Sequence, residues 1–113
     1  MTDPTPSAED AKLVTLARAT RARTGAAEGA AVRDLDGRTY AGASVALESL
    51  SLTALEVCVA MAVASGSRGL EAAVVLTTAD ATPDLAAVRE FAGPDVPVHV
   101  GDARGTLVST LRT

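Results

Sequence analysis

The chain has 113 residues, of which 48% are hydrophobic and 21% charged, so it suits one folded domain and is too apolar for a disordered protein. Its formal net charge of −4 argues against nucleic acid or an anionic membrane as a partner, because both attract basic surfaces. Only Tyr40 and Phe91 are aromatic. The core is therefore built from small side chains, and self-association would extend it.

The sequence contains no signal for export or membrane insertion. Residues 2–10 are polar and acidic, and the longest apolar run, residues 57–64, is too short to cross a bilayer. A single cysteine, Cys58, excludes an internal disulfide and fits a reducing compartment. We expect a cytoplasmic protein with a flexible arm over residues 1–6 and a single domain over residues 7–113.

The first elements expected are a helix and a β-hairpin. Ser7 is a suitable N-cap, and Gly25 is a suitable end for the helix. Two strand-like runs then follow, over residues 29–33 and 38–45. They flank Asp36-Gly37, a pair typical of hairpin turns.

Leu47 to Gly66 is expected to form the second helix, with Ser49 or Ser51 as its N-cap. This segment is apolar around most of its circumference, which indicates burial on more than one side. We expect one side to lie on the sheet and another to contact a second subunit. The sequence therefore predicts a homo-oligomer, a dimer or a tetramer, formed through this helix.

The second half of the chain has the pattern of an α/β unit. Residues 72–78 form a continuous apolar run typical of a central strand, and Thr82-Pro83-Asp84 should start a helix that ends near Gly93. A strand is expected over residues 96–100, and a last strand or a tail over residues 106–111. Together the elements predict a three-layer α/β fold with a mixed sheet of about five strands and helices on both faces.

The spacing of several short segments resembles that of the cytidine deaminase family. In outline that family reads V-G-A-A-L, D-G, Y-x-G-C-N-V-E, L-T-x-C-A-E and A-x-x-x-G. The matching segments are Gly29-Ala30-Ala31-Val32, Asp36-Gly37, Tyr40-Ala41-Gly42-Ala43-Ser44-Val45, Leu52-Thr53 and Ala64-Ser65-Gly66. The resemblance implies a cytidine deaminase-like fold.

The same resemblance implies zinc chemistry, for which the matching residues are unsuitable. A zinc deaminase needs metal ligands and a glutamate that moves protons. The first ligand falls on Leu55 and the proton shuttle on Val57, while the ribose-binding Asn and Glu fall on Ser44 and Ala46. We therefore predict no metal, no cofactor and no catalytic residues, and conclude from the sequence that the protein is not an enzyme. Leu55 and Val57 are expected to fill the former pocket as core.

Three functions remain open at this point. The first is a non-catalytic, oligomeric protein that binds another protein. The second is a nucleoside or small-molecule sensor that uses a remnant pocket near Ser44, Ala46, Leu55 and Asp84. The third is an enzyme of another class that uses Asp or Glu groups, with Glu48 and Glu56 or Asp80 and Asp84 as candidates. Cys58 with His99 is a nucleophile–base pair on paper only, because Cys58 is expected to be a small buried core residue and His99 lies in the middle of a strand.

Overall fold

A computed structural model of the chain describes residues 6–113, so the predicted arm lies outside the described residues except for Pro6. The elements follow in the order α1 (Ala8–Thr24), β1 (Glu28–Asp34), β2 (Thr39–Ala43), β3 (Val45–Ala46), β4 (Ser51–Leu52), α2 (Ala54–Ala64), β5 (Leu70–Thr77), α3 (Ala86–Ala92), β6 (Pro97–Gly101) and β7 (Leu107–Arg112). Five strands form one sheet in the order β2-β1-β5-β6-β7, and β3 with β4 forms a separate hairpin.

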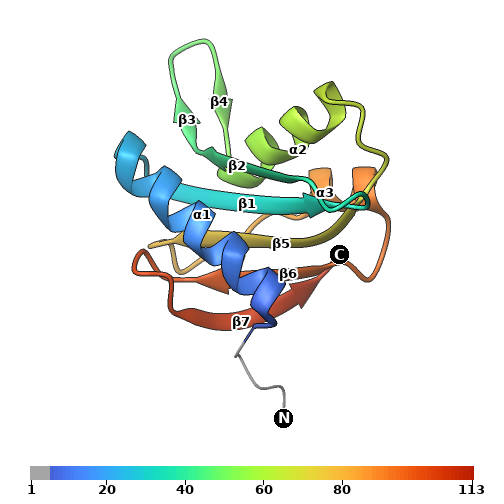
Figure 1. The fold of residues 1–113 in the computed structure, drawn as a ribbon. Helices are drawn as coiled ribbons and strands as arrows, with labels where there is room; N and C mark the ends of the chain where they lie inside the picture. The colour runs from blue at the N-terminus through green and yellow to red at the C-terminus, as the bar shows by residue number, and fades with distance from the viewer. Residues whose placement is uncertain (1–5) are drawn as a thin grey trace.

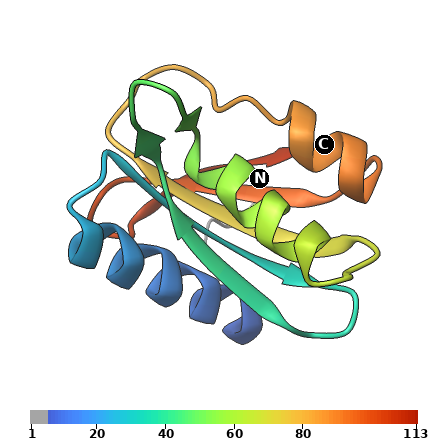
Figure 2. The same cartoon turned by 90° about the horizontal axis from the view of Figure 1, so that it is seen from above.

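The sheet is covered by helices on both faces. Helix α1 packs on one face, and α2 and α3 lie on the other (Figures 1 and 2). Strands β5 and β6 are parallel, while the other neighbouring strands are antiparallel. The predicted three-layer α/β fold with a five-stranded mixed sheet is confirmed. Within residues 6–113, no helix is long and apolar enough to cross a membrane.

The central strand β5 supplies side chains to both halves of the core. Val75 belongs to the larger cluster beneath α2 and α3, whereas Val74 and Leu76 belong to the cluster beneath α1. Successive side chains of a strand point to opposite faces. A strand buried on both faces therefore needs a continuous apolar run, which explains why residues 72–77 could be recognised in the sequence.

The start of α1 is anchored to the sheet by charged groups. Asp10 Oδ1 accepts a hydrogen bond from Arg33 Nη2 at 2.9 Å, and its Oδ2 lies 2.8 Å from His99 Nε2. Burial raises the pKa of Asp10, but the hydrogen bonds with His99 and Arg33 outweigh it, so that the pKa lies below its usual value. The contacts join the first helix to β1 and β6.

The expected helix from Leu47 to Gly66 is too long at its start. Val45 pairs with Leu52 in the β3–β4 hairpin, so that α2 begins only after Thr53. Thr53 Oγ1 accepts from the Glu56 backbone N–H at 3.1 Å, and Glu56 Oε1 accepts from that of Thr53 at 2.8 Å. This capping box satisfies two backbone donors, which a lone Ser49 or Ser51 cannot do.

The start of α3 also differs from its prediction. The helix begins at Ala86 rather than near Thr82, and Asp84 is not a first-turn acid. Instead, Asp84 Oδ1 accepts from the Ala86 N–H at 2.9 Å, which holds the chain in a turn before the helix. The next residue, Leu85, is buried in the core and fixes where the helix can start.

A buried carboxylate, Asp34, joins the β1–β2 turn to the segment after α2. Its Oδ1 accepts from the backbone N–H groups of Asp36 and Arg38, both at 2.9 Å. Its Oδ2 accepts from the hydroxyls of Ser67 at 2.5 Å and Tyr40 at 3.4 Å. The Ser67 hydrogen bond and these other donors hold the pKa of Asp34 below its usual value despite burial.

Two glycines allow the helices to approach the β1–β2 hairpin closely. A Cβ on Gly29 would lie 2.3 Å from the backbone oxygen of Ala17 in α1, and one on Gly42 would lie 2.7 Å from Val57 Cγ1 in α2. Cβ atoms do not approach other atoms so closely, so neither position has room for a side chain. Val57 therefore faces strand β2.

We predict that Asp34→Asn lowers stability at neutral pH and that the difference shrinks in acid. Because the pKa of Asp34 is lower in the folded state than its usual 3.8, its ionised form stabilises the fold above that value. This contribution is lost as the pH falls through the folded-state pKa. Urea unfolding of both proteins at neutral pH and near pH 3 measures it; an identical pH dependence in the two proteins would contradict the prediction.

We also predict that Gly42→Ala destabilises the protein through its clash with Val57. Overpacking of this kind costs about 1–3 kcal/mol. Adding Val57→Ala should recover part of the loss, because it removes the atom that the new Cβ meets. Unfolding free energies of the two single variants and the double variant give the coupling directly. An equal cost of Gly42→Ala in both backgrounds would mean that Val57 is not the source.

Candidate functional site

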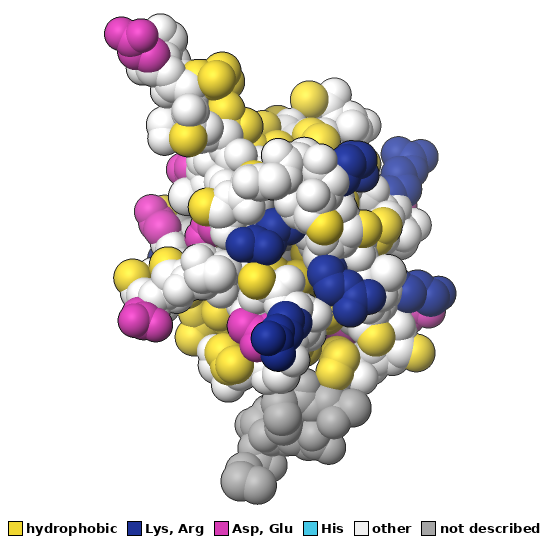
Figure 3. Space-filling view, turned by 90° about the vertical axis from the view of Figure 1, so that its left-hand side faces the viewer, with side chains coloured by type: hydrophobic (Ala, Val, Ile, Leu, Met, Phe, Trp, Pro, Cys, Tyr) yellow, Lys and Arg dark blue, Asp and Glu magenta, His cyan; other side chains and the backbone are white. Residues whose placement is uncertain are grey.

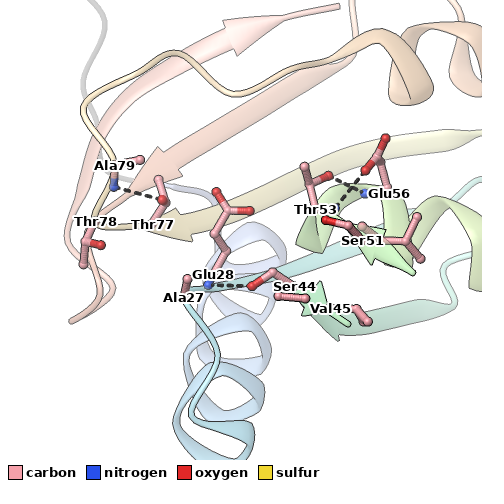
Figure 4. A pocket seen from close by; sticks show the side chains of 12 residues that line it. Ala27, Glu28, Ser44, Val45, Ser51, Thr53, Glu56, Thr77, Thr78 and Ala79 are labelled. Carbon is pink, nitrogen blue, oxygen red and sulfur yellow. Dashed lines mark hydrogen bonds between the residues drawn. The ribbon is translucent and has the colours of Figure 1, made fainter. Parts of the chain in front are cut away.

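A pocket of about 370 Å³ opens where β5 ends and β1 starts. Glu28 pairs with Thr77 across these antiparallel strands, which brings the two strand ends to one edge of the sheet. The β3–β4 hairpin and the start of α2 complete the walls (Figure 4). The lining residues are Ala27, Glu28, Ser44, Val45, Ala46, Ser51, Leu52, Thr53, Glu56, Thr77, Thr78 and Ala79.

Two carboxylates lie at the start of α2, beside the pocket. Glu56 is held by its hydrogen bond with the Thr53 backbone, whereas Glu28 Oε1 accepts from the Ala54 N–H over a longer 3.5 Å. Figure 4 shows the Glu28 side chain between Thr77 and Thr53. Carboxylates are stabilised at this end of a helix, where the backbone N–H groups carry partial positive charge. The Glu28 carboxylate is therefore held less firmly by the protein than that of Glu56.

A second, smaller cavity of about 30 Å³ adjoins the pocket, and Glu28 and Thr53 line both. Its other lining residues are Leu55, Val75, Pro83 and Asp84. A cavity of this volume is roughly the size of one or two water molecules. It contains the position at which the resemblance placed a zinc ligand, Leu55, beside the carboxylates of Glu28 and Asp84.

The structure divides the four predicted pocket residues between the two cavities. Ser44 and Ala46 line the larger one, and Leu55 and Asp84 line the smaller one. Ser44 Oγ accepts a hydrogen bond from the Glu28 N–H at 3.1 Å, so that this hydroxyl also fixes the start of β1. Val57 lines neither cavity, because it points towards Gly42; the expectation that Val57 fills the former pocket is wrong.

The residues around these cavities do not fit the zinc ion that the resemblance implies. Leu55 offers only carbon atoms, and burial raises the pKa of the nearby Cys58 thiol to about 12, which keeps it protonated. Zinc sites use three or four converging side chains, with thiolate as the sulfur ligand. Among residues 6–113, no group of three or more His, Cys, Asp or Glu side chains is placed to hold a metal ion.

The remaining candidate pairs are separated by the fold. Cys58 is a buried residue of α2 on one side of the sheet, whereas His99 contacts Asp10 on the α1 side, so the two cannot act together. Glu48 lies in the turn of the β3–β4 hairpin and does not line the pocket with Glu56. Asp80 lines a different cavity from Asp84.

Sequence analysis missed Glu28 as a site residue. The signal was present, because Glu28 directly precedes Gly29, where the family outline has the apolar Val of V-G-A-A. A charged residue at an apolar position of a strand start indicates that its side chain reaches a polar space.

Comparisons with known proteins agree with the fold described above. The family model for cytidine deaminase-like proteins matches residues 6–105. A crystal structure of cytidine deaminase from Burkholderia pseudomallei has a TM-score of 0.72 at 23% identity, covering 90% of this chain and 89% of that one. One from Mycobacterium leprae has a TM-score of 0.69 at 22% identity, covering 93% and 94%. No match was found among curated protein sequences.

The conclusion drawn from the sequence, that the protein is not an enzyme, is contradicted by these comparisons. Both solved structures are cytidine deaminases, which are enzymes. The misfit at Leu55 concerns zinc alone, and nothing in the described residues shows that a catalytic site was lost. At this level of identity the two structures establish the fold, while the family model spans most of the sequence. The chain therefore belongs to the cytidine deaminase-like family.

Proposed function

We propose that the pocket at the start of α2 binds a nucleoside or another small molecule of similar size. The observation that carries the proposal is the 370 Å³ cavity in which Ser44, Ala46 and Thr77 meet. Small-molecule sites have volumes of roughly 300–1,000 Å³. Ligands of open α/β sheets bind at the carboxyl ends of parallel strands, and this pocket lies at that end of the central strand β5. The cytidine deaminases that share the fold make a nucleoside the first ligand to test.

The lining suits a molecule with a polar and an apolar part. Hydroxyls of Ser51, Thr53 and Thr78 can donate and accept hydrogen bonds, as a sugar requires. Val45 and Leu52 provide apolar surface on which a flat ring could lie. This combination of a few polar groups with apolar walls is typical of small-molecule sites.

Our second proposal is that the protein is an enzyme of another class than the zinc hydrolases. A reaction of the bound molecule would then depend on the carboxylates beside the pocket. Glu28 reaches both cavities, and Asp84 reaches the smaller one. General acid–base catalysis needs such a group within hydrogen-bond distance of the proton that moves. Two carboxylates near one cavity could act together as the general acid and the general base.

We predict that cytidine raises the thermal unfolding midpoint. A free concentration about ten times the Kd stabilises the folded state by roughly 1.4 kcal/mol, which is a shift of several degrees for a chain of this size. Ala46→Trp should remove the shift by filling the pocket, since Ala46 is exposed on its wall. Ala19→Trp is the matched control, because Ala19 is exposed on α1 and does not line the pocket. No shift with millimolar cytidine, uridine or adenosine would contradict the proposal.

A role as an oligomeric interaction module, with a second copy or another protein as partner, is a further proposal. It is supported by three exposed apolar side chains in the hairpin and α2 region: Leu47 at 65%, Leu50 at 48% and Val63 at 53%. The first two lie in the turn between β3 and β4, which projects from the body (Figures 1 and 3). Exposed apolar groups that project in this way favour association.

We extend the proposal to the setting of the protein. A cytoplasmic location is supported by the lone, buried Cys58. Residues 7–113 would act as a single domain, since the five-stranded sheet runs from β2 to β7 without interruption.

If the chain associates through the hairpin and α2, the combined change Leu47→Ser and Leu50→Ser should shift it towards the 11.3 kDa monomer. Leu35→Ser is the matched control, because Leu35 is 54% exposed in the β1–β2 turn. Sedimentation velocity over a range of concentrations measures the change. A monomer at every concentration before any substitution would exclude self-association, and binding of a different protein would remain as the alternative role.

A further inference from the structure

We propose that the pocket beside α2 selects a ligand that carries a positive charge over neutral or anionic ligands of the same size. The inference rests on the proposed small-molecule function and names the chemical class of its ligand. Three observations support it. The charged side chains of the lining are all acidic, the Glu28 side chain makes only one long hydrogen bond within the described part of the protein, and the opposing helix dipole is smaller than the charge of the carboxylates.

The charged groups of the lining all have the same sign. Glu28 and Glu56 are the only ionisable side chains among the twelve lining residues. Across residues 6–113, neither carboxylate forms an ion pair with a basic group of the protein. An anionic ligand would therefore meet repulsion with no compensating cation in the wall, whereas a cation would meet attraction from two sides.

Glu28 has acceptor capacity that a ligand could use. Its side chain makes one hydrogen bond within the described part of the chain, the 3.5 Å contact from Oε1 to the Ala54 N–H. A carboxylate can accept about four hydrogen bonds. Glu56, in contrast, is held in the capping box by a 2.8 Å hydrogen bond with the Thr53 N–H. The ligand's cationic group would therefore contact Glu28.

The helix dipole opposes this preference and does not cancel it. The start of a helix carries the equivalent of roughly half a positive charge, whereas the two carboxylates carry two full negative charges. The net local charge is then about −1.5 in the same units. The pocket is also partly open to water, which weakens the attraction without changing its sign.

The experiment compares two isomers that differ in charge. Methylation of cytidine at ring nitrogen N3 gives a cation at neutral pH, whereas methylation of the exocyclic amine gives the neutral isomer N4-methylcytidine. Calorimetric titration of the unaltered protein should show 3-methylcytidine binding about five- to tenfold more tightly, the effect expected of one charge near a carboxylate in a partly solvated site. Cytidine 5′-monophosphate should bind most weakly, and added salt should reduce the differences.

The role of Glu28 is tested with Glu28→Gln, which keeps the shape and the acceptor oxygen but removes the charge. In this variant the preference for the cation should fall to within about twofold, as expected when one of two charges is removed and the other is held by the helix. Glu90→Gln, an equal charge change on α3 outside the pocket lining, should leave the preference unchanged. Thermal unfolding of both variants establishes that they fold.

The possible results distinguish the charge preference, the role of Glu28 and the small-molecule function from one another. Equal or tighter binding of N4-methylcytidine would overturn the charge preference and leave the small-molecule function intact. A preference for the cation that survives Glu28→Gln would overturn the assignment to Glu28. If none of the three compounds binds, the proposed function fails together with the inference. The comparison of isomers needs no variant, so it remains decisive even if Glu28→Gln does not fold.

Discussion

The close contact of two helices with one β-hairpin is the constraint on which the rest of the structure depends. Helix α1 lies against Gly29 and α2 against Gly42, on opposite faces of the same pair of strands. A core of Ala, Val and Leu has short side chains, so its layers must approach one another closely to exclude water. This approach fixes the position of α2, and with it the helix start that forms one wall of the pocket.

The parts of the fold that could be predicted from the sequence are those with local signals. Ser7 caps α1, where its Oγ accepts from the Asp10 N–H at 3.1 Å, and Gly25 ends the helix. The start of α2 also has a local signal, the capping box Thr53-x-x-Glu56, but the residues before it favoured a longer helix. The pairing of Val45 with Leu52, which rules out that longer helix, is a contact between two short strands that propensity does not encode. The segment from Leu47 to Leu52 is apolar enough for either structure.

The candidate site was predictable only where a resemblance supplied the positions. Ser44, Ala46 and Leu55 were placed by matching segments, and all three line a cavity. Glu28 was missed although it stands at the Val position of V-G-A-A, because its place in the pocket depends on its pairing with Thr77, 49 residues later in the chain. Val57 shows the opposite failure: its position in the motif was clear, but its direction is set by the packing of α2 on Gly42.

The contact between Asp10 and His99 links residues 89 positions apart, so the first helix is fixed to β6, the last strand but one. During synthesis, α1 can form early from its own turns, but its first turn has no partner on β6 until most of the chain has emerged. Asp10 can meet Arg33 as soon as β1 has formed, whereas its contact with His99 closes a much longer loop and forms only once β6 is present. Completion of the fold is therefore a late event that joins the two ends of the sequence.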